Sequence, residues 1–154
     1  MGKKTIFILL LFSATLFPLF SDVKEDFDKN VDFSVTLELI HRALTANRID
    51  AITTEKVVIL DGAISSIEIK DPEPESFFAE ITIVDGKWIG LKDVRMFTCI
   101  VEVSGPEFAA RIPARRSRRE IRNEIAANSH VIVAGKITDF QNLSSENPSA
   151  VLEG

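Results

Sequence analysis

Long stretches of alternating apolar and polar residues, interrupted by single glycines, constrain the fold of this chain more than any other feature. Alternation runs from residue 57 to residue 69 around Gly62, and again from residue 131 to residue 137 around Gly135. A period of two is typical of β-strands with one buried face. A glycine inside a strand permits a bulge or a sharp bend. The sequence therefore predicts long strands that bend at glycine, as the closing of a small β-barrel requires.

The other elements complete a mainly β order. Helical spacing of Phe33, Leu37, Ile40 and Leu44 predicts an N-terminal helix over residues 32–50, with Asp32 as its N-cap. Alternation predicts strands at residues 77–83 and 93–103, joined by a connection that starts at residues 85–86, and a last strand at residues 150–153. A short helix is expected near residues 117–126. The predicted order is helix, three strands, short helix, strand and terminal strand.

This order, with Gly62, Gly135 and the position of the short helix, resembles the OB-fold over about residues 55–154. The resemblance implies a five-stranded Greek-key barrel with a short helix between strands three and four. The barrel would be closed, or partly open beside the short last strand, and an open antiparallel sheet with a helix on one face is the alternative. An exported domain of this kind after a helix also looks like the small periplasmic OB-fold proteins of bacteria.

The N-terminus has the pattern of a secretory signal peptide. Lys3 and Lys4 precede an apolar run over residues 5–20, and the small residue Ser21 offers a cleavage site. We therefore expect a signal peptide at residues 1–21, a charged spacer at 22–31, and a periplasmic or secreted domain. An uncleaved membrane anchor is the alternative, but Pro18 disturbs the last turns of such a helix.

Charge and cysteine content limit the class of ligand. The chain has 18 basic and 23 acidic residues, and loss of Lys3 and Lys4 with the signal leaves 16 basic residues and a net charge of −7. An acidic domain disfavours non-specific binding to nucleic acid or to an anionic membrane. Cys99 is the only cysteine, so no intrachain disulfide forms, and we expect its side chain to be a small buried hydrophobe.

The resemblance implies that ligands bind on the face of strands two and three, between two loops. These loops would be the acidic segment at residues 71–75 and the polar segment at 141–149, and Trp88, Arg95 and Phe78 are the candidate ligand-binding residues. Glu80, Thr82 and Thr98 would share that face. The acidic loop favours a protein, peptide or small-molecule ligand over nucleic acid. For Trp88 the alternative is a buried position beneath the connection that follows residue 86.

A dense run of arginines is the most unusual local composition in the chain. Arginine binds phosphate and carboxylate groups through two parallel hydrogen bonds, so the run is a candidate patch for an anion or a partner. The alternative is a solvated helix start with an Arg116 to Glu120 ion pair. The run consists of Arg111, Arg115, Arg116, Arg118, Arg119 and Arg122.

Nothing in the sequence predicts catalysis, a metal site or a cofactor. The two histidines, His41 and His130, fall on separate predicted elements, and neither a phosphate-binding glycine loop nor a nucleophile motif is present. We therefore expect a non-catalytic exported module that binds a protein, a peptide or a small molecule. Binding of a polyanion (nucleic acid, lipid headgroup or polysaccharide) through the arginine run is the alternative. A small periplasmic enzyme is a third and disfavoured interpretation.

Overall fold

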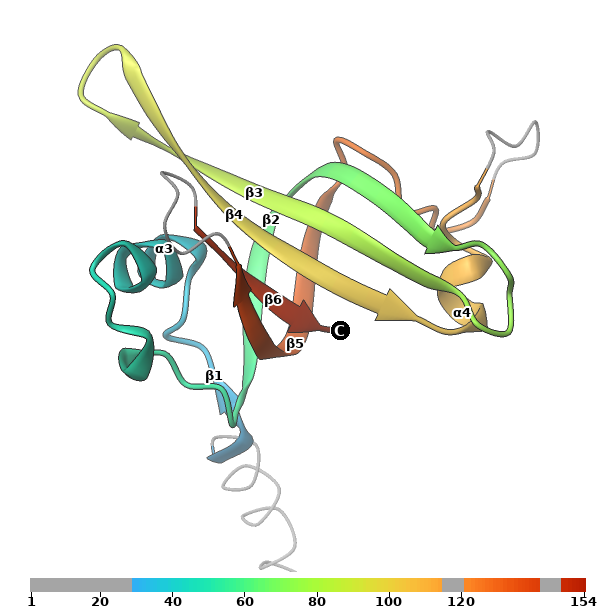
Figure 1. Ribbon diagram of the computed structural model, residues 1–154. Helices are drawn as coiled ribbons and strands as arrows, with labels where there is room; N and C mark the ends of the chain where they lie inside the picture. Colours follow the sequence, from blue (N-terminus) through green and yellow to red (C-terminus); the bar gives the residue numbers. More distant parts are fainter. Residues whose placement is uncertain (1–28, 115–120, 142–147) are drawn as a thin grey trace, which may run out of the picture.

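Strands dominate the computed structural model, which describes residues 29–114, 121–141 and 148–154 (Figure 1). The expected signal peptide and four of the six arginines of the run lie outside these residues. The described chain contains no helix that is long and apolar enough to span a membrane. Its elements are β1 (Val31–Asp32), α3 (Leu37–Thr45), the 3-10 helix η1 (Ile49–Ala51), β2 (Val57–Asp71), β3 (Phe78–Ile89), β4 (Asp93–Ser104), α4 (Pro106–Ala109), β5 (His130–Gln141) and β6 (Ser149–Glu153).

Five of these strands close into a barrel. The sheet runs in the order β2-β3-β4-β6-β5, and β5 pairs back with β2. The β4–β6 pair is parallel, whereas the other four pairs of the barrel are antiparallel. This strand order confirms the predicted OB-like Greek-key barrel and excludes the open sheet. The short β6 is long enough to close the barrel, and β1 adds a two-residue parallel strand beside β2.

The two interior glycines lie where strands approach each other closely. A Cβ atom at Gly62 would lie 2.8 Å from the backbone oxygen of Val84, and one at Gly135 would collide with the backbone oxygen of Glu153. Both positions therefore require a residue without a side chain. Figure 1 shows the strong curvature of β2, as the sequence predicted for glycine-interrupted strands.

The barrel interior is filled by the alternating residues that the sequence identified. Ala79, Ile81 and Ile83 of β3 are buried, as are Phe97, Cys99, Val101 and Val103 of β4. Burial of Cys99 raises the pKa of its thiol to about 12. This thiol was expected to be a small buried hydrophobe, and the structure places it in the core.

The N-terminal helix is shorter than predicted. It begins after Thr36, whose hydroxyl accepts a hydrogen bond from the Leu39 N–H at 3.2 Å, so Thr36 is the N-cap in place of Asp32. The Asp32 carboxylate instead accepts a bond from the Ser34 N–H in the preceding turn. Phe33 lies outside the helix and is exposed. The rest of the predicted stripe is confirmed, because Leu37, Ile40 and Leu44 are buried where α3 packs against β4 and β6.

The short helix between the third and fourth barrel strands exists, but at a different position. It is α4, which begins directly after β4 with Pro106 in its first turn. Proline has a φ angle that suits the first turn of a helix, so Pro106 favours a helix that begins here. Of the segment predicted as a helix, residues 117–120 lie outside the described residues, and residues 121–126 form turns and irregular chain.

The connection predicted to start at residues 85–86 is wrong, because β3 continues through it, whereas the next strand starts at residue 93 as predicted. β3 runs on to Ile89 and β4 begins at Asp93, so that the turn consists of residues 90–92. Pairing of β3 with β2 ends at Val84, and pairing of β4 with β6 starts at Cys99. Residues 85–97 therefore form a two-stranded arm that projects from the barrel, at the upper left of Figure 1.

Candidate binding surface on the β3–β4 arm

The two faces of the arm differ in chemistry. Successive side chains of a strand point to opposite faces, so the inward phase of the barrel continues into the arm as one face. That inner face carries four charged residues, Asp85, Lys87, Asp93 and Arg95. The opposite face, which we call the outer arm face, consists of Trp88, Val94 and Met96 with Gly86 between them.

The outer arm face is apolar and open to solvent. Trp88 is 69% exposed, and Val94 and Met96 are each 45% exposed. Trp88 lies opposite Val94 and Gly86 opposite Met96 in the strand register. Gly86 leaves room for both neighbours, because a Cβ atom there would lie 3.2 Å from the sulfur of Met96 and 3.4 Å from a methyl of Val94. The three side chains therefore form one surface.

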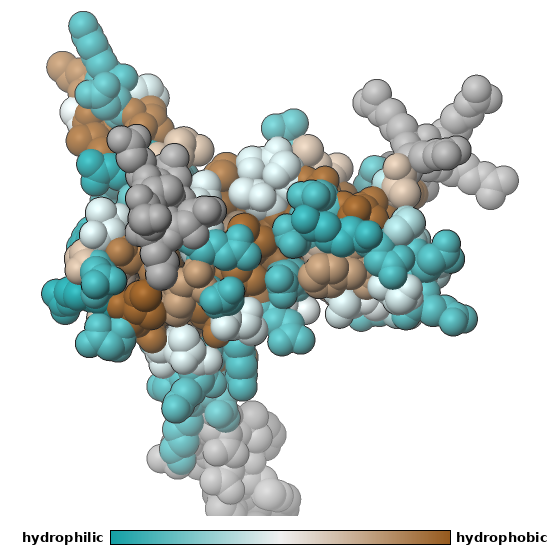
Figure 2. Space-filling model, in the orientation of Figure 1, coloured by the Kyte–Doolittle hydropathy of each residue, from teal (hydrophilic) through white to brown (hydrophobic). Residues whose placement is uncertain are grey.

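The tip of the arm extends this apolar surface. Leu91 is 97% exposed in the turn, where Gly90 has a φ of +73°. Ile89, beside the turn, is 43% exposed but lies on the inner face, opposite Asp93. Figure 2 shows hydrophobic surface on the projecting arm at the upper left, interleaved with hydrophilic atoms. Large apolar side chains gathered on a projecting element are typical of an interaction site.

The inner face attaches the arm to helix α3. The Lys87 ammonium lies 2.7 Å from one carboxylate oxygen of Glu38, and Arg42 lies 2.8 Å from the other. The hydrogen bond from Lys87 lowers the pKa of Glu38, and Arg42 lowers it further. This contact joins residues 49 positions apart and holds the arm over the helix.

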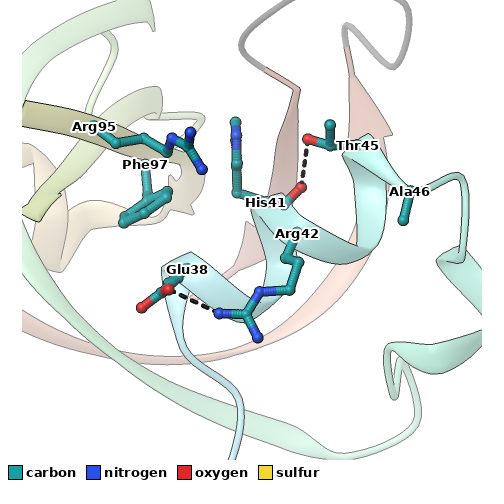
Figure 3. Close-up of a pocket in the computed structure, with 7 residues that line it drawn as sticks. All are labelled: Glu38, His41, Arg42, Thr45, Ala46, Arg95 and Phe97. Atoms are coloured by element: carbon teal, nitrogen blue, oxygen red, sulfur yellow. Dashed lines mark hydrogen bonds and ion pairs between the residues drawn. The ribbon is translucent and has the colours of Figure 1, made fainter. Parts of the chain in front are cut away.

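A cleft of about 570 Å³ lies between α3 and the base of the arm (Figure 3). Arg95 and Phe97 of β4 face His41 across it, and the His41 and Phe97 ring centroids are 5.4 Å apart. Arg95 makes no ion pair with any residue that the structure describes. Among the described residues Glu38 is the only acidic residue that lines the cleft, and both of its oxygens are already engaged.

The structure separates the three residues that the sequence grouped as a ligand site. Trp88 and Phe78 share the outer phase of β3 but lie at its two ends, and Arg95 lies on the inner face. The alternative of a buried Trp88 is wrong, since its side chain is mostly exposed. The sequence-based grouping placed Arg95 on the wrong face, although alternation within the predicted strand at residues 93–103 already puts Arg95 in phase with Phe97 and out of phase with Thr98.

A row of four glutamates on the barrel surface was missed. Glu68, Glu80, Glu102 and Glu153 occupy four neighbouring strands and are partners in the strand register. Each side chain lies on the outer phase of its strand. The sequence places a glutamate on each of these strands, but only the strand register shows that they align. We refer to these residues as the glutamate row.

The arginine run is described only at its ends. Arg111 and Arg122 are exposed, and the Arg111 Nε donates to the backbone oxygen of Asn123 at 3.0 Å. Arg115, Arg116, Arg118 and Arg119 lie outside the described residues, as does the proposed ion pair with Glu120. The anion patch therefore stays a prediction.

The two histidines lie apart and on different elements. His130 is exposed, with its Nε2 3.9 Å from a carboxylate oxygen of Asp61, whereas His41 lines the cleft beside α3. Within the described ranges no three His, Cys, Asp or Glu side chains are placed to hold a metal ion.

The strand order defines the class: a closed five-stranded β-barrel, consistent with an OB-like fold, with an additional strand and a projecting arm. No protein-family model matches the chain, and no curated protein matches its sequence.

Proposed function

We propose that this protein is an exported, non-catalytic binding module that holds a protein or peptide partner on its outer arm face. The observation that carries the proposal is the exposure of Trp88 on a projecting arm whose opposite face is attached to α3. Tryptophan contributes a large contact area at a low entropic cost and is enriched at the centres of interfaces. We further propose that the chain is an OB-fold protein similar to the small periplasmic OB-fold proteins of bacteria, as its strand order and position of the short helix suggest.

The shape of the arm supports a macromolecular partner over a small molecule. Small ligands bind in concave sites that cover most of their surface. Trp88 instead projects from a two-stranded ribbon, and the 570 Å³ cleft beside α3 lies toward the opposite face. A peptide or protein surface can cover the three side chains of the outer arm face together.

A selection with random peptides tests this proposal. The probe is a displayed library of 16-residue peptides applied to the full chain, and the affinities of recovered peptides are then measured by fluorescence anisotropy. We expect Trp88→Ser and Met96→Ser each to weaken binding by about tenfold or more, because the anchors of an interface carry most of its binding energy. Since Trp88 and Met96 are exposed, both variants should unfold at the temperature of the parent.

Asp93→Ala is the matched control, because Asp93 lies on the same arm but on its inner face. It should leave binding unchanged. Recovered peptides that bind Trp88→Ser and Met96→Ser as tightly as the parent would contradict the proposed function.

Polyanion binding is the second candidate, and a specific observation supports it. Arg111 and Arg122 are both exposed and form no ion pair with any described carboxylate. Arg111→Ala combined with Arg122→Ala should lower the salt concentration that elutes the protein from heparin, if the run binds anions. Equal elution of the variant and the parent would exclude this role for the two residues.

A further inference from the structure

The glutamate row brings negative charges together on neighbouring strands. Glu68 is the register partner of Glu80, Glu80 of Glu102, and Glu102 of Glu153. Partners in neighbouring strands have Cβ atoms about 5 Å apart, and like charges at this separation destabilise a sheet. The row therefore contains three consecutive repulsive pairs.

Only one half of the row is compensated within the described chain. The Lys70 ammonium lies 2.9 Å from Glu68 and 3.3 Å from Glu80. Its hydrogen bond with Glu68 contributes most to raising the pKa of Lys70. Glu102 and Glu153 form no ion pair with a described residue, and Lys136 is the register partner of Glu153 without contacting its carboxylate. Two carboxylates are thus left for a cation from elsewhere.

The carboxylate of Glu102, which has no ion-pair partner among the described residues, lies on the same side of β3 and β4 as the outer arm face. Glu80 and Glu102 lie on the outer phase of β3 and β4, the same phase as Trp88, Val94 and Met96. The cross-strand pairs between them are Thr82 with Ile100 and Val84 with Thr98. Six residues separate the pair formed by Gly86 and Met96 from the pair of glutamates, or about 20 Å along the strands at ~3.3 Å per residue.

We propose that the outer arm face and the glutamate row form one elongated site for a basic peptide segment of a partner protein. Apolar residues of the segment cover Trp88, Val94 and Met96, and lysine or arginine residues about six positions away pair with Glu102 and Glu153. This inference rests on the proposed function and adds the chemistry of the partner. A second copy of this chain would bring a further glutamate row, so charge complementarity favours a different, cationic chain.

Two synthetic peptides test the inference. Each carries three large apolar residues, a Gly-Ser-Gly spacer and three charged residues, so that the centres of the two blocks are six residues apart. One peptide ends in lysines and the other in glutamates. We expect the lysine peptide to bind the full chain at least about tenfold more tightly in fluorescence anisotropy, with a difference that shrinks as salt is added.

Variants of the glutamate row identify which carboxylates bind the basic residues of the peptide. Glu102→Gln combined with Glu153→Gln should weaken binding of the lysine peptide by about tenfold, to the level of the glutamate peptide. The control is Asp50→Asn combined with Glu55→Gln, which removes the same charge from exposed residues outside the barrel strands and should have no effect. The row variant should unfold close to the temperature of the parent, because it removes the repulsive Glu80–Glu102 and Glu102–Glu153 pairs together with the attraction between Lys136 and Glu153.

The outcomes separate this inference from the proposed function. Binding of the lysine peptide that is lost in Trp88→Ser but unchanged in the row variant would overturn the basic partner and leave the arm as the binding surface. Binding that is lost in the row variant but unchanged in Trp88→Ser would overturn both the elongated site and the proposed function. Equal affinity for the two peptides, or a dimer of the parent that Trp88→Ser dissociates, would overturn the inference.

Discussion

Gly135 is the position at which one added methyl group would disturb the barrel most. A Cβ atom there meets the backbone oxygen of Glu153 in β6, and backbone cannot move aside as a flexible side chain can. We expect Gly135→Ala to lower the free energy of unfolding by about 2 kcal/mol or more, as overpacking of a tight site does. Urea unfolding, followed by far-UV circular dichroism, measures this loss.

Gly86→Ala is the matched control for Gly135→Ala, since its Cβ atom would meet the flexible end of Met96 and a methyl of Val94. Gly86→Ala should lower the free energy of unfolding by less than about 1 kcal/mol. Equal losses for the two variants would mean that the close approach of β5 and β6 does not constrain Gly135.

Cys99 should be chemically inert in the folded protein. Its thiol is fully buried, and burial raises its pKa to about 12, so the reactive thiolate is scarce at neutral pH. We expect no labelling by iodoacetamide at pH 8 within an hour, and complete labelling in 6 M guanidinium chloride. Because the folded-state pKa is raised, ionisation of the thiol favours the unfolded state only as the pH rises above the ordinary value of about 9. Rapid labelling of the native chain would show that the barrel opens at β4.

Among the elements, the arm and helix α3 depend on each other through Glu38. The ion pair with Lys87 joins them, and Lys87 lowers the pKa of Glu38. A lowered folded-state pKa means that the contact contributes at pH values above the unfolded pKa and is lost as the pH falls through the folded one. Glu38→Gln should therefore loosen the arm at pH 7, and the parent should loosen only in acid.

The measurement for Glu38→Gln is the time-resolved fluorescence anisotropy of Trp88, the only tryptophan in the chain. We expect the fast component of the anisotropy decay, which reports local motion of the arm, to be larger in Glu38→Gln than in the parent at pH 7. Glu55→Gln is the control and should have the same decay as the parent. An unchanged decay in Glu38→Gln would show that strand pairing alone fixes the arm.

The elements also show what local sequence signals can and cannot establish. The stripe of Leu37, Ile40 and Leu44 predicted a helix correctly, because burial of one face determines the period. The predicted first residue of this helix was wrong, because Asp32 and Thr36 are both good N-caps. Only the pairing of residues 31–32 with β2, which keeps Asp32 in a strand, decides between them. The arm was missed because Asp85 and Gly86 together are typical of a turn, whereas pairing with β4 keeps both in a strand.

At the scale of the whole molecule, the barrel could be predicted but its surface could not. Gly62 and Gly135 identify the bent strands, and the short helix between strands three and four indicates the topology. The glutamate row depends on the strand register, which no local pattern specifies when the residues concerned face solvent. Binding surfaces of this kind arise from residues that are distant in the chain, so their chemistry becomes visible only in the folded sheet.

The methyl resonance of Met96 offers the most direct test of the central claim, that partners bind on the outer arm face. Met96 and Met1 are the only methionines in the chain, and Met1 belongs to the expected signal peptide, so ¹³C-methyl labelling of methionine gives one signal from the mature domain, which a Met96→Leu variant assigns. On addition of a library-selected peptide, we expect a saturable shift of the Met96 signal, and no shift on addition of a scrambled peptide of the same composition. A peptide that binds, as measured by anisotropy, while the Met96 signal stays unshifted would contradict the account.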